Sequence, residues 1–490
     1  MKRIGTSIMF VTITLLSQAQ TVYNLEDCRR LATTHNKDIL IASENVKAAK
    51  NLQKAARTQY LPNFSANGTY FWNEKNISLL GEDKYLPIYN TNANGTTNFA
   101  TSVNNKFTLV NGSPVPLDAS GTPFDPTKNP EKILWKSYAY IPKDQFEFDT
   151  HNVFAGTIMM TQPIFMGGKI RELNKIAKYT KKIAEIKLDG ETSDVLLQTD
   201  EAYWRVVSLV NKEKLAKSYV ALLQKMDSDL EKSIAFGVAT KSDGLSVKVK
   251  LNEGEMSLLQ VQDGLSLSKM ALAQICGLPL ESDFTLADEN IQPQEPVTKP
   301  VVDMTGAIEK RYEVQGLKQS INIAESNRRI MLSRFMPNAG LTAGYLVSNP
   351  NMYNGYSNEF AGMWQVGVVL NVPIFHFGEK LYTLKAAQIE KKIAQYQLDD
   401  AREKIQLDIT QASFKISEAA KKAKMTKYNK DKAQENLKYA TIGFESGVIS
   451  PSVLMEAQTA WLKANSEEID ASINVKLCDV YLQKAIGELK

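Results

Sequence analysis

The chain has 490 residues, with 58 lysines and arginines against 54 aspartates and glutamates and a formal charge of +4. Its 43% hydrophobic and 23% charged residues exclude a disordered or collagen-like chain, and the near-neutral balance argues against a simple basic nucleic-acid binder. The cysteines, Cys28, Cys276 and Cys478, lie far apart without a CxxC motif, so they predict neither a zinc module nor a disulfide framework. We expect them to be small buried residues.

The first residues have the pattern of a secretory signal peptide. Lys2 and Arg3 precede an apolar run at 8–16, and Ser17-Gln-Ala19 has the small-x-small form of a signal-peptidase site. We therefore expect residues 1–19 to be removed; an uncleaved, buried N-terminal helix is the alternative. The apolar run is too short to span a bilayer, and no later stretch reaches the roughly 18 apolar residues of a transmembrane helix. The sequence predicts an exported chain without a helical anchor.

Internal repetition divides the rest of the chain into two copies. The segment YLPNFSANGTY at 60–70 matches FMPNAGLTAGY at 335–345, an offset of 275 residues. Later landmarks share an offset of 210 residues: 163–168 with 373–378, Gly237-Val238 with Gly447-Val448, and Cys276-Gly277 with Ile486-Gly487. The two offsets differ by 65 residues, which lie between Tyr70 and Pro163 in the first copy. We predict a first repeat at 20–280, a linker at 281–304 and a second repeat at 305–490.

Each copy begins with a helical pattern and continues with strand-like alternation. Residues 25–60 and 305–335 have the composition of helices without internal proline. The alternation that follows is about 11 residues long in each strand, enough to cross a bilayer as a tilted barrel strand. We expect strands at about 62–72, 153–164, 337–347 and 364–374. Pro163, Gly168, Pro373 and Gly378 mark the junctions from strand to helix.

Aromatic residues at the strand ends favour a membrane barrel over an ordinary soluble hairpin, which is the alternative. The opposite strand face carries Ser, Asn, Thr, Gln and Gly, which suit a wet lumen. Four strands cannot close a barrel, and an open edge in lipid would leave backbone groups unpaired, so other copies of the chain must complete it. The candidate membrane-interface aromatics are Tyr60, Tyr70, Trp72, Tyr345 and Trp364.

Each hairpin leads into a long helical segment, at 169–236 and at 379–446, with Gly190 as an interruption of the first. Each would be about 100 Å long, and apolar residues recur in coiled-coil steps. Glycine turns at 237–243 and 447–453 end them, and shorter return helices follow. An opening helix and a return helix together match one long helix, which predicts a tube wall with the glycine turns at its tip.

With the motifs YLPNFSANGTY, QPIFMGGK, FGVATKSD and SGVISPSVLMEAQ, the sequence resembles the TolC family of outer-membrane efflux proteins over nearly the whole mature chain. The resemblance implies a mainly α fold with a transmembrane β-barrel, in which a homotrimer forms a twelve-stranded β-barrel continued by a twelve-helix periplasmic α-barrel. It places the protein in the outer membrane of a Gram-negative bacterium, in contact with lipid. It implies a passive exit duct for tripartite efflux or type I secretion, which docks a periplasmic adaptor and an inner-membrane pump of RND, ABC or MFS type.

The resemblance also assigns residues at the tip. Asp243 and Glu456 are pore-gate candidates, because acidic side chains repeated around a narrow axis favour cations; for Glu456 a solvated glutamate at a helix start is the alternative. Val453 and Ile449 stand where some members carry an acidic residue and a latch arginine, so no salt-bridge latch is expected. The adaptor-docking candidates are Gly237, Val238, Gly447, Val448 and Leu454.

The insertion at 73–150 is rich in Asn, Gly, Thr and Pro and would lie at the cell surface between the first two strands. A loop of this length either has a function, such as capping the channel mouth or binding a surface partner, or is disordered.

Two other classes of protein compete with a channel. An enzyme would need converging polar groups, but His35, His151 and His376 belong to different regions, and GxSxG, HExxH, P-loop and GxGxxG motifs are absent. We therefore expect no catalytic residue, metal or cofactor. A periplasmic or surface coiled-coil scaffold without a pore would explain the long helices but not the duplicated hairpins.

Overall fold

The computed structural model describes residues 21–87, 89–91, 97–99, 106–118, 120–132, 138–290 and 302–489. The predicted signal peptide at 1–19 and residues 291–301 of the predicted linker lie outside the described residues. The chain divides into a helical unit, from the described parts of 1–58, 168–335 and 375–490, and a sheet unit from 59–167 and 336–374.

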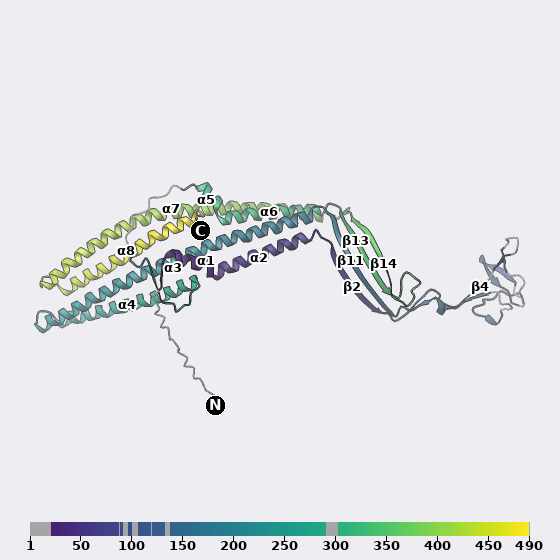
Figure 1. The fold of residues 1–490 in the computed structure, drawn as a ribbon, viewed down its shortest axis with the longest axis horizontal. Helices are drawn as coiled ribbons and strands as arrows, with labels where there is room; N and C mark the ends of the chain where they lie inside the picture. The colour runs from purple at the N-terminus through teal and green to yellow at the C-terminus, as the bar shows by residue number, and fades with distance from the viewer. Residues whose placement is uncertain are drawn as a thin grey trace, which may run out of the picture. The chain divides into compact units, whose positions relative to one another are not determined.

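The helical unit contains two helices of 67 residues, each packed against shorter ones (Figure 1). At 1.5 Å per residue, each long helix extends for about 100 Å. The first, α3, packs against α2 and α4, and the second, α7, packs against α6 and α8; α3 also contacts α6 and α8, which joins the two repeats. The helices are α1 (Leu25–His35), α2 (Lys37–Thr58), α3 (Lys169–Ala235), α4 (Lys241–Cys276), α5 (Met304–Lys310), α6 (Tyr312–Ser333), α7 (Glu379–Glu445) and α8 (Pro451–Ala485).

Both predicted opening helices are broken, which corrects the expectation of single helices at 25–60 and 305–335. The first breaks at Asn36, whose side-chain amide donates to the carbonyl of Ile275 at 3.4 Å. The second breaks at Arg311, whose guanidinium donates to the carbonyls of Lys484 and Ala485 at 3.1 and 3.2 Å. The last carbonyls of a helix have no partner within it. Each break therefore supplies donors to the end of a return helix, α4 or α8.

The predicted interruption of α3 at Gly190 is also absent, since α3 continues through this residue. Gly190 instead allows close packing between the repeats, because a Cβ atom there would lie 2.8 Å from the Cδ2 atom of the Tyr312 ring on α6.

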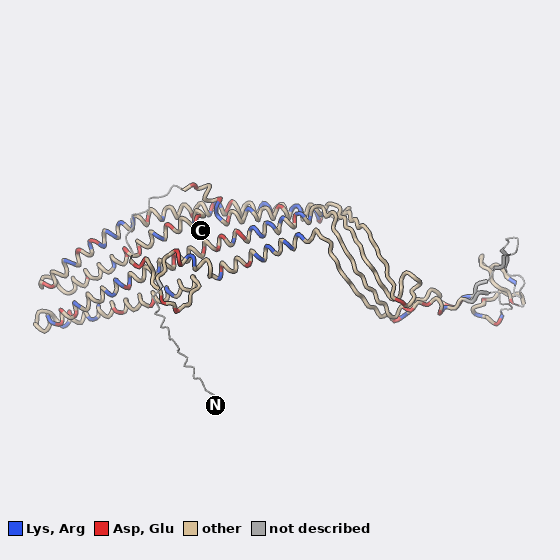
Figure 2. The backbone as a smooth tube through the Cα atoms, viewed as in Figure 1, with Lys and Arg blue, Asp and Glu red and all other residues tan. Residues whose placement is uncertain are grey.

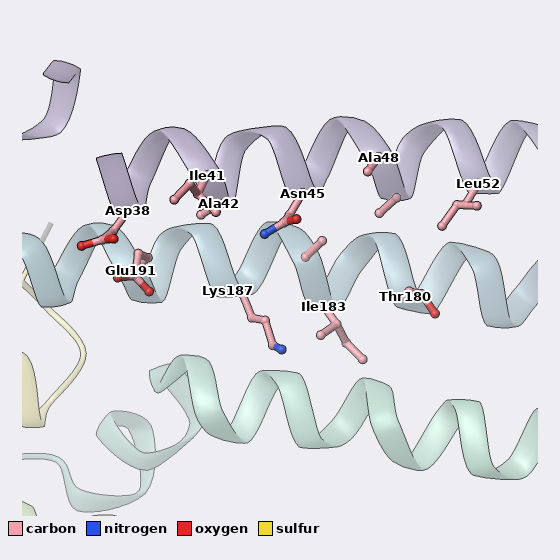
Figure 3. A pocket seen from close by; sticks show the side chains of 12 residues that line it. Asp38, Ile41, Ala42, Asn45, Ala48, Leu52, Thr180, Ile183, Lys187 and Glu191 are labelled. Atoms are coloured by element: carbon pink, nitrogen blue, oxygen red, sulfur yellow. The ribbon is translucent and has the colours of Figure 1, made fainter. Parts of the chain in front are cut away.

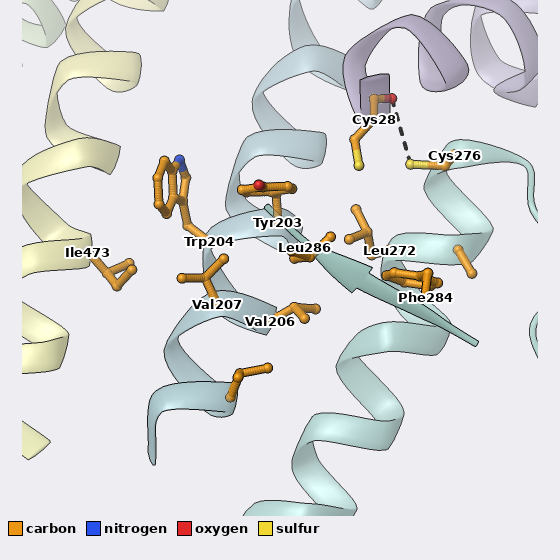
Figure 4. Packing of buried hydrophobic residues seen from close by; sticks show 12 residues of the cluster. Cys28, Tyr203, Trp204, Val206, Val207, Leu272, Cys276, Phe284, Leu286 and Ile473 are labelled. Carbon is orange, nitrogen blue, oxygen red and sulfur yellow. Dashed lines mark hydrogen bonds between the residues drawn. The ribbon is translucent and has the colours of Figure 1, made fainter. Parts of the chain in front are cut away.

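A core at the middle of the helical unit joins α1, α3 and α4 (Figure 4). Tyr203 and Phe284 are among its fully buried side chains. Two short parallel strands that the sequence did not predict, β1 (Thr21–Tyr23) and β12 (Phe284–Leu286), contribute to it. The cysteines are buried as expected, and the Cys276 thiol donates to the carbonyl of Cys28 at 3.6 Å.

A buried ion pair fixes α1 on α3. The Arg29 guanidinium donates from Nε and Nη2 to the two carboxylate oxygens of Asp200, at 2.8 and 2.5 Å. Asp200 is fully buried, and this burial raises the pKa of its carboxyl above the usual value, although Arg29 opposes the shift.

The sheet unit is built on four antiparallel strands in the order β14-β13-β11-β2. Residues directly opposite each other on antiparallel strands have side chains on the same face. The register places Tyr345 opposite both Ile158 and Trp364, and Ile158 opposite Ala66, so one face is apolar across all four strands. The strands are β2 (Asn63–Trp72), β11 (Asn152–Met166), β13 (Asn338–Asn349) and β14 (Ala361–Asn371).

The opposite face of this sheet is mainly polar or small. One row across it contains Asn63, Thr161, Thr342 and Gly367, and the next contains Ser65, Met159, Gly344 and Gln365. The two faces therefore differ in polarity, as in a sheet that separates lipid from water.

The described part of the insertion at 73–150 forms short paired strands. β3 pairs with β10, β4 with β9, β5 with β6, and β7 with β8, all antiparallel. Their bounds are β3 (Ile77–Ser78), β4 (Lys84–Pro87), β5 (Tyr89–Thr91), β6 (Thr97–Phe99), β7 (Phe107–Val110), β8 (Ser113–Pro116), β9 (Tyr138–Ile141) and β10 (Glu147–Phe148), with 3₁₀ helices η1 (Pro130–Lys132) and η2 (Lys143–Phe146).

The contact at Gly190 yields a test of how the repeats are joined. We expect Gly190→Ala to destabilise the protein by about 1–3 kcal/mol, because its Cβ atom meets the Tyr312 ring. The matched control is Gly316→Ala on α6, where a Cβ atom has nothing within 4 Å; it should stabilise by up to about 1 kcal/mol through helix propensity. Thermal loss of helical circular dichroism measures both, and equal stabilisation by the two alanines would contradict this packing.

Candidate functional site

The most unusual feature of the sheet is that both outer strands have an unpaired edge. β2 and β14 each pair with one neighbour among the described residues. All of β2 and almost all of β14 is exposed, and Trp364 on the apolar face is 75% exposed. A free edge beside an exposed apolar face is a site for pairing with another chain or for contact with a membrane.

The structure brings some of the predicted interface aromatics together. The Tyr345 and Trp364 rings contact each other across β13 and β14, with centroids 5.0 Å apart. Tyr70 contacts Phe154 at 4.8 Å, and its hydroxyl donates to the Asn152 side chain at 2.8 Å.

The remaining predicted aromatics mark the two ends of β2. Trp72 lies at the C-terminal end of β2, on the face of Tyr70. Tyr60 precedes the strand, and its carbonyl accepts a hydrogen bond from the Gln162 side chain at 2.9 Å. The aromatics therefore lie toward both ends of the strand. Phe154 was missed, although it belongs to the apolar set of the predicted strand 153–164.

Left-handed residues lead into both long helices. Gly168 and Gly378 cap α3 and α7 with φ of 86° and 88°. The residues before them, Gly167 and Phe377, also have positive φ, of 59° and 43°. Two successive left-handed residues turn the chain from strand to helix, and glycine adopts this conformation without a steric cost.

The two junction prolines do not occupy equivalent places, which corrects the expected symmetry. Pro163 lies within β11, which continues to Met166, and the register with β13 shifts just after it. A bulge accommodates a proline inside a strand, because the ladder is already interrupted there. Pro373 instead follows the end of β14 at Asn371, so that strand begins and ends three residues earlier than the predicted 364–374.

The tip turns have the same backbone geometry in both repeats. Gly237 and Gly447 have φ of 76° and 73°. The amide of Val238 donates to the carbonyl of Ser233 at 2.9 Å, and the amide of Val448 donates to the equivalent Gly443 at 2.8 Å. These are Schellman-type helix ends, in which the glycine supplies the left-handed residue.

The tip turns expose large apolar side chains to solvent. Val238 is 80% exposed and Val448 is 79% exposed. Phe236, which sequence reasoning did not select, is 84% exposed; its position before the capping glycine was the available signal. Three exposed apolar side chains on two adjacent turns are a surface for protein contact.

The other tip candidates have different environments. Leu454 is only 3% exposed and packs with Met226, Leu230 and Val247, so it is a core residue rather than a docking residue. Asp243 caps α4: its carboxylate accepts from the Thr240 amide at 3.2 Å, and its own amide donates to the Thr240 hydroxyl at 3.1 Å.

Glu456 is exposed and lines an open groove of about 550 Å³ between α4 and α8. Lys250, Glu253 and Lys463 line the same groove, and Lys250 and Glu253 form an ion pair at 2.9 Å. The Glu456 carboxylate is therefore available to solvent and to ions. The structure does not bring Glu456 together with Asp243, which is held in its helix cap.

An apolar stripe that the sequence analysis missed lies along α7. Its members are exposed in the single chain and are spaced by seven residues or, from Phe414 to Tyr428, by fourteen: Tyr382, Ile389 and Tyr396, then Leu407, Phe414 and Tyr428. A similar exposed stripe on α4 includes Val249, Met256 and Met270. Steps of seven are typical of helices that pack against a partner helix, so both stripes indicate missing neighbours.

A second groove, of about 460 Å³, lies between α2 and α3 (Figure 3). Ile41, Leu52 and Ile183 give it an apolar lining, while Asp38 and Glu191 lie at one end. Ile41 and Leu52 are exposed, so this part of α2 also presents an apolar surface without a partner.

Neither a metal-ligand cluster nor a membrane-spanning helix is found in the described part of the chain. Within those residues, no three His, Cys, Asp or Glu side chains are grouped to hold a metal ion. No helix there is both long and apolar enough to cross a bilayer.

Known proteins resemble this chain in its second repeat and over about two thirds of its length. The model of the outer membrane efflux protein family matches residues 305–488. Outer membrane protein TolC of Escherichia coli K12 is 20% identical over 349 residues, 69% of this chain and 70% of TolC. The cobalt-zinc-cadmium resistance protein CzcC of Cupriavidus metallidurans is 23% identical over 314 residues, 63% of this chain and 71% of CzcC.

A solved structure extends the likeness to both repeats. The outer membrane protein VceC from Vibrio cholerae superposes with a TM-score of 0.67 over 94% of this chain and 96% of VceC, at 16% identity. The fold is thus shared along nearly the whole chain. Together with the family match over the second repeat, these likenesses indicate an outer membrane efflux protein of the TolC type.

Proposed function

We propose that three copies of this chain form an outer-membrane channel, the passive exit duct of a tripartite efflux or type I secretion system. The observation that carries this proposal is the four-stranded sheet, with one apolar face and two open edges. The family is one of channels, and we assign no catalytic role to the chain.

The open edges support closure of the sheet with other copies. Four strands are too few for a barrel, since small barrels have about eight. β2 and β14 run antiparallel to each other, because three antiparallel pairings separate them. β14 of one copy can therefore continue the antiparallel ladder on β2 of the next, and three copies give a twelve-stranded barrel.

The helical unit supports the same assembly. The exposed stripes on α7 and on α4 each need a partner helix. In a closed ring of copies, the α7 stripe of one copy would pack against the α2 and α4 surface of the next. The apolar residues that are exposed in the single chain would then be buried, and the helices would form a tube.

The tip supports docking of a periplasmic adaptor, through which an inner-membrane pump would be reached. Phe236, Val238 and Val448 give this end an exposed apolar surface on rigid, glycine-capped turns. Aromatic and aliphatic side chains of this kind anchor protein interfaces. We place the docking surface on these residues and leave out the buried Leu454.

Cross-linking between copies tests the barrel. In chains carrying Ala66→Cys on β2, a second cysteine at Trp364, Val366, Val368 or Leu370 lies on the same face of the sheet. We expect at least one of these pairs to give disulfide-linked trimers on non-reducing gels. Cysteines at Gln365 or Gly367, on the opposite face, are the matched controls and should not link. Monomers in every pairing would contradict closure through β2 and β14.

Substitution at the tip tests adaptor docking. We expect Val238→Asp with Val448→Asp to weaken retention of the cognate adaptor by roughly tenfold or more, because two exposed apolar contacts are replaced by charges. The control, Lys241→Glu, changes charge at the start of α4 without removing an apolar contact. Co-purification of the adaptor with the intact trimer measures the effect, and equal retention in all three proteins would place docking elsewhere.

Channel recordings test Glu456 as a gate residue. Three exposed carboxylates around the axis would favour cations, so Glu456→Gln should lower the ratio of cation to anion permeability. Glu435→Gln, which removes an exposed glutamate paired with Lys432, is the control and should leave this ratio unchanged. If Glu456→Gln has no effect, Glu456 is a solvated helix-start residue.

A further inference from the structure

Lysine and arginine are concentrated in the helical turns that adjoin the four strands along the chain. The nearest 14 residues, about 21 Å of helix, are 45–58, 169–182, 321–334 and 379–392. Together they hold 17 lysines and arginines and 4 aspartates and glutamates, against 58 and 54 in the whole chain. We call these four segments the basic collar; Figure 2 shows the clustering of blue on these helix ends.

The opposite ends of the same helices have no such excess. The 14 residues nearest the tip turns in α3, α4, α7 and α8 are 222–235, 241–254, 432–445 and 451–464. They contain 8 basic and 8 acidic residues. The positive charge is therefore a property of the strand-adjoining ends and not of helix ends in general.

Carboxylates within the collar are too few to neutralise it. Glu172, whose side chain is 4% exposed, forms ion pairs with Arg171, Lys175 and Arg329 at 3.3, 2.8 and 3.8 Å. Glu325 also serves three cations, Arg328, Arg329 and Lys391, at 2.8, 3.0 and 3.2 Å. Its hydrogen bond with Arg328 is the main reason that the pKa of Glu325 is well below its usual range. Two glutamates are thus shared by five cations.

Eight further cations of the collar have no ion-pair partner among the described residues, and all but Lys380, which is half-buried, are exposed. Like charges at this density repel one another, so an external anion would stabilise them. They are Lys50, Lys54, Arg57, Lys169, Lys178, Lys380, Lys385 and Lys392.

Exposed aromatic residues accompany these cations in the segment just before α7. Phe375 and Phe377 are largely exposed, with ring centroids 4.8 Å apart. Exposed aromatics mixed with lysines are typical of the boundary between lipid and water, where rings enter the headgroup layer and ammonium groups reach phosphates. Exposed phenylalanine side chains would be unfavourable on a helical surface that contacts only water.

We propose that the basic collar binds the anionic headgroups of phospholipids in the periplasmic leaflet of the outer membrane. This inference rests on the proposed function, in which the four strands cross the bilayer. Two to seven residues separate each strand from its collar segment: 59–62, 167–168, 335–337 and 372–378. The collar thus follows the strands at the depth where headgroup phosphates lie, and it fixes how far the barrel enters the membrane.

Lipid retention by the full-length mature trimer tests this inference. The trimer is reconstituted in a mixture of phosphatidylglycerol and phosphatidylethanolamine, extracted in neutral detergent and analysed by native mass spectrometry. We expect phosphatidylglycerol to be enriched by roughly tenfold over its share in the mixture, and the enrichment to fall as salt is raised. Equal retention of the two lipids would overturn the proposal.

Glutamine variants of the collar and of the tip test which lysines and arginines cause the enrichment of phosphatidylglycerol. Replacing Lys50, Lys54, Arg57, Lys385 and Lys392 by glutamine should abolish the enrichment, whereas the same change at the tip lysines Lys225, Lys232, Lys241, Lys432 and Lys438 should preserve it. Equal enrichment in both variants would overturn the assignment to the collar. Displacement of the lipid by soluble glycerol phosphate at equal concentration would assign the site to a free anion and overturn the lipid proposal.

Channel conductance separates this test from the proposed function. A wild-type chain that forms channels in both lipids but shows no lipid preference contradicts the collar alone. A chain that forms no channels in either lipid contradicts the proposed function and the collar with it.

Discussion

The architecture depends on the unpaired backbone groups along the outer edges of β2 and β14. In water these groups would bond to solvent, but in a bilayer each would lie unpaired at a cost of several kcal/mol. The apolar face of the same sheet indicates lipid as its surroundings, so the edges require further strands. One chain supplies four strands, and other copies of the same chain are the available source of the remaining strands. Oligomerisation is therefore a condition for the sheet unit to exist in a membrane.

The duplicated sequence gives the helical unit the same dependence on neighbours. Both long helices begin after two left-handed residues and end at a left-handed glycine, so each repeat presents a tip turn of the same geometry. The breaks at Asn36 and Arg311 interrupt the opening helices where the return helices end, and their side chains bond to carbonyls of α4 and α8. The stripe on α7 remains exposed, as expected of a surface completed by the next copy.

The period of the apolar residues and the spacing of the repeated motifs were sufficient to place the strands and the long helices. Alternation, coiled-coil steps and glycine turns are all local signals. Features that depend on tertiary contact were missed. Asn36 and Arg311 look like ordinary helix residues until the ends of α4 and α8 lie beside them. Leu454 was assigned to the surface because it follows a tip turn, but its helix face packs on Met226 and Leu230. The exposure of Phe236 and of the α7 stripe likewise follows from packing, which one sequence does not reveal.

The central claim is that the edges of the sheet close through copies of the same chain. Its most direct test is electron microscopy, with mass determination, of the mature protein extracted from outer membranes in mild detergent. The account predicts a particle with threefold symmetry and a helical tube on the order of 100 Å long, as the 67-residue helices require. A monomer that stays soluble without detergent would contradict closure of the barrel, and the long helices would then belong to a scaffold without a pore.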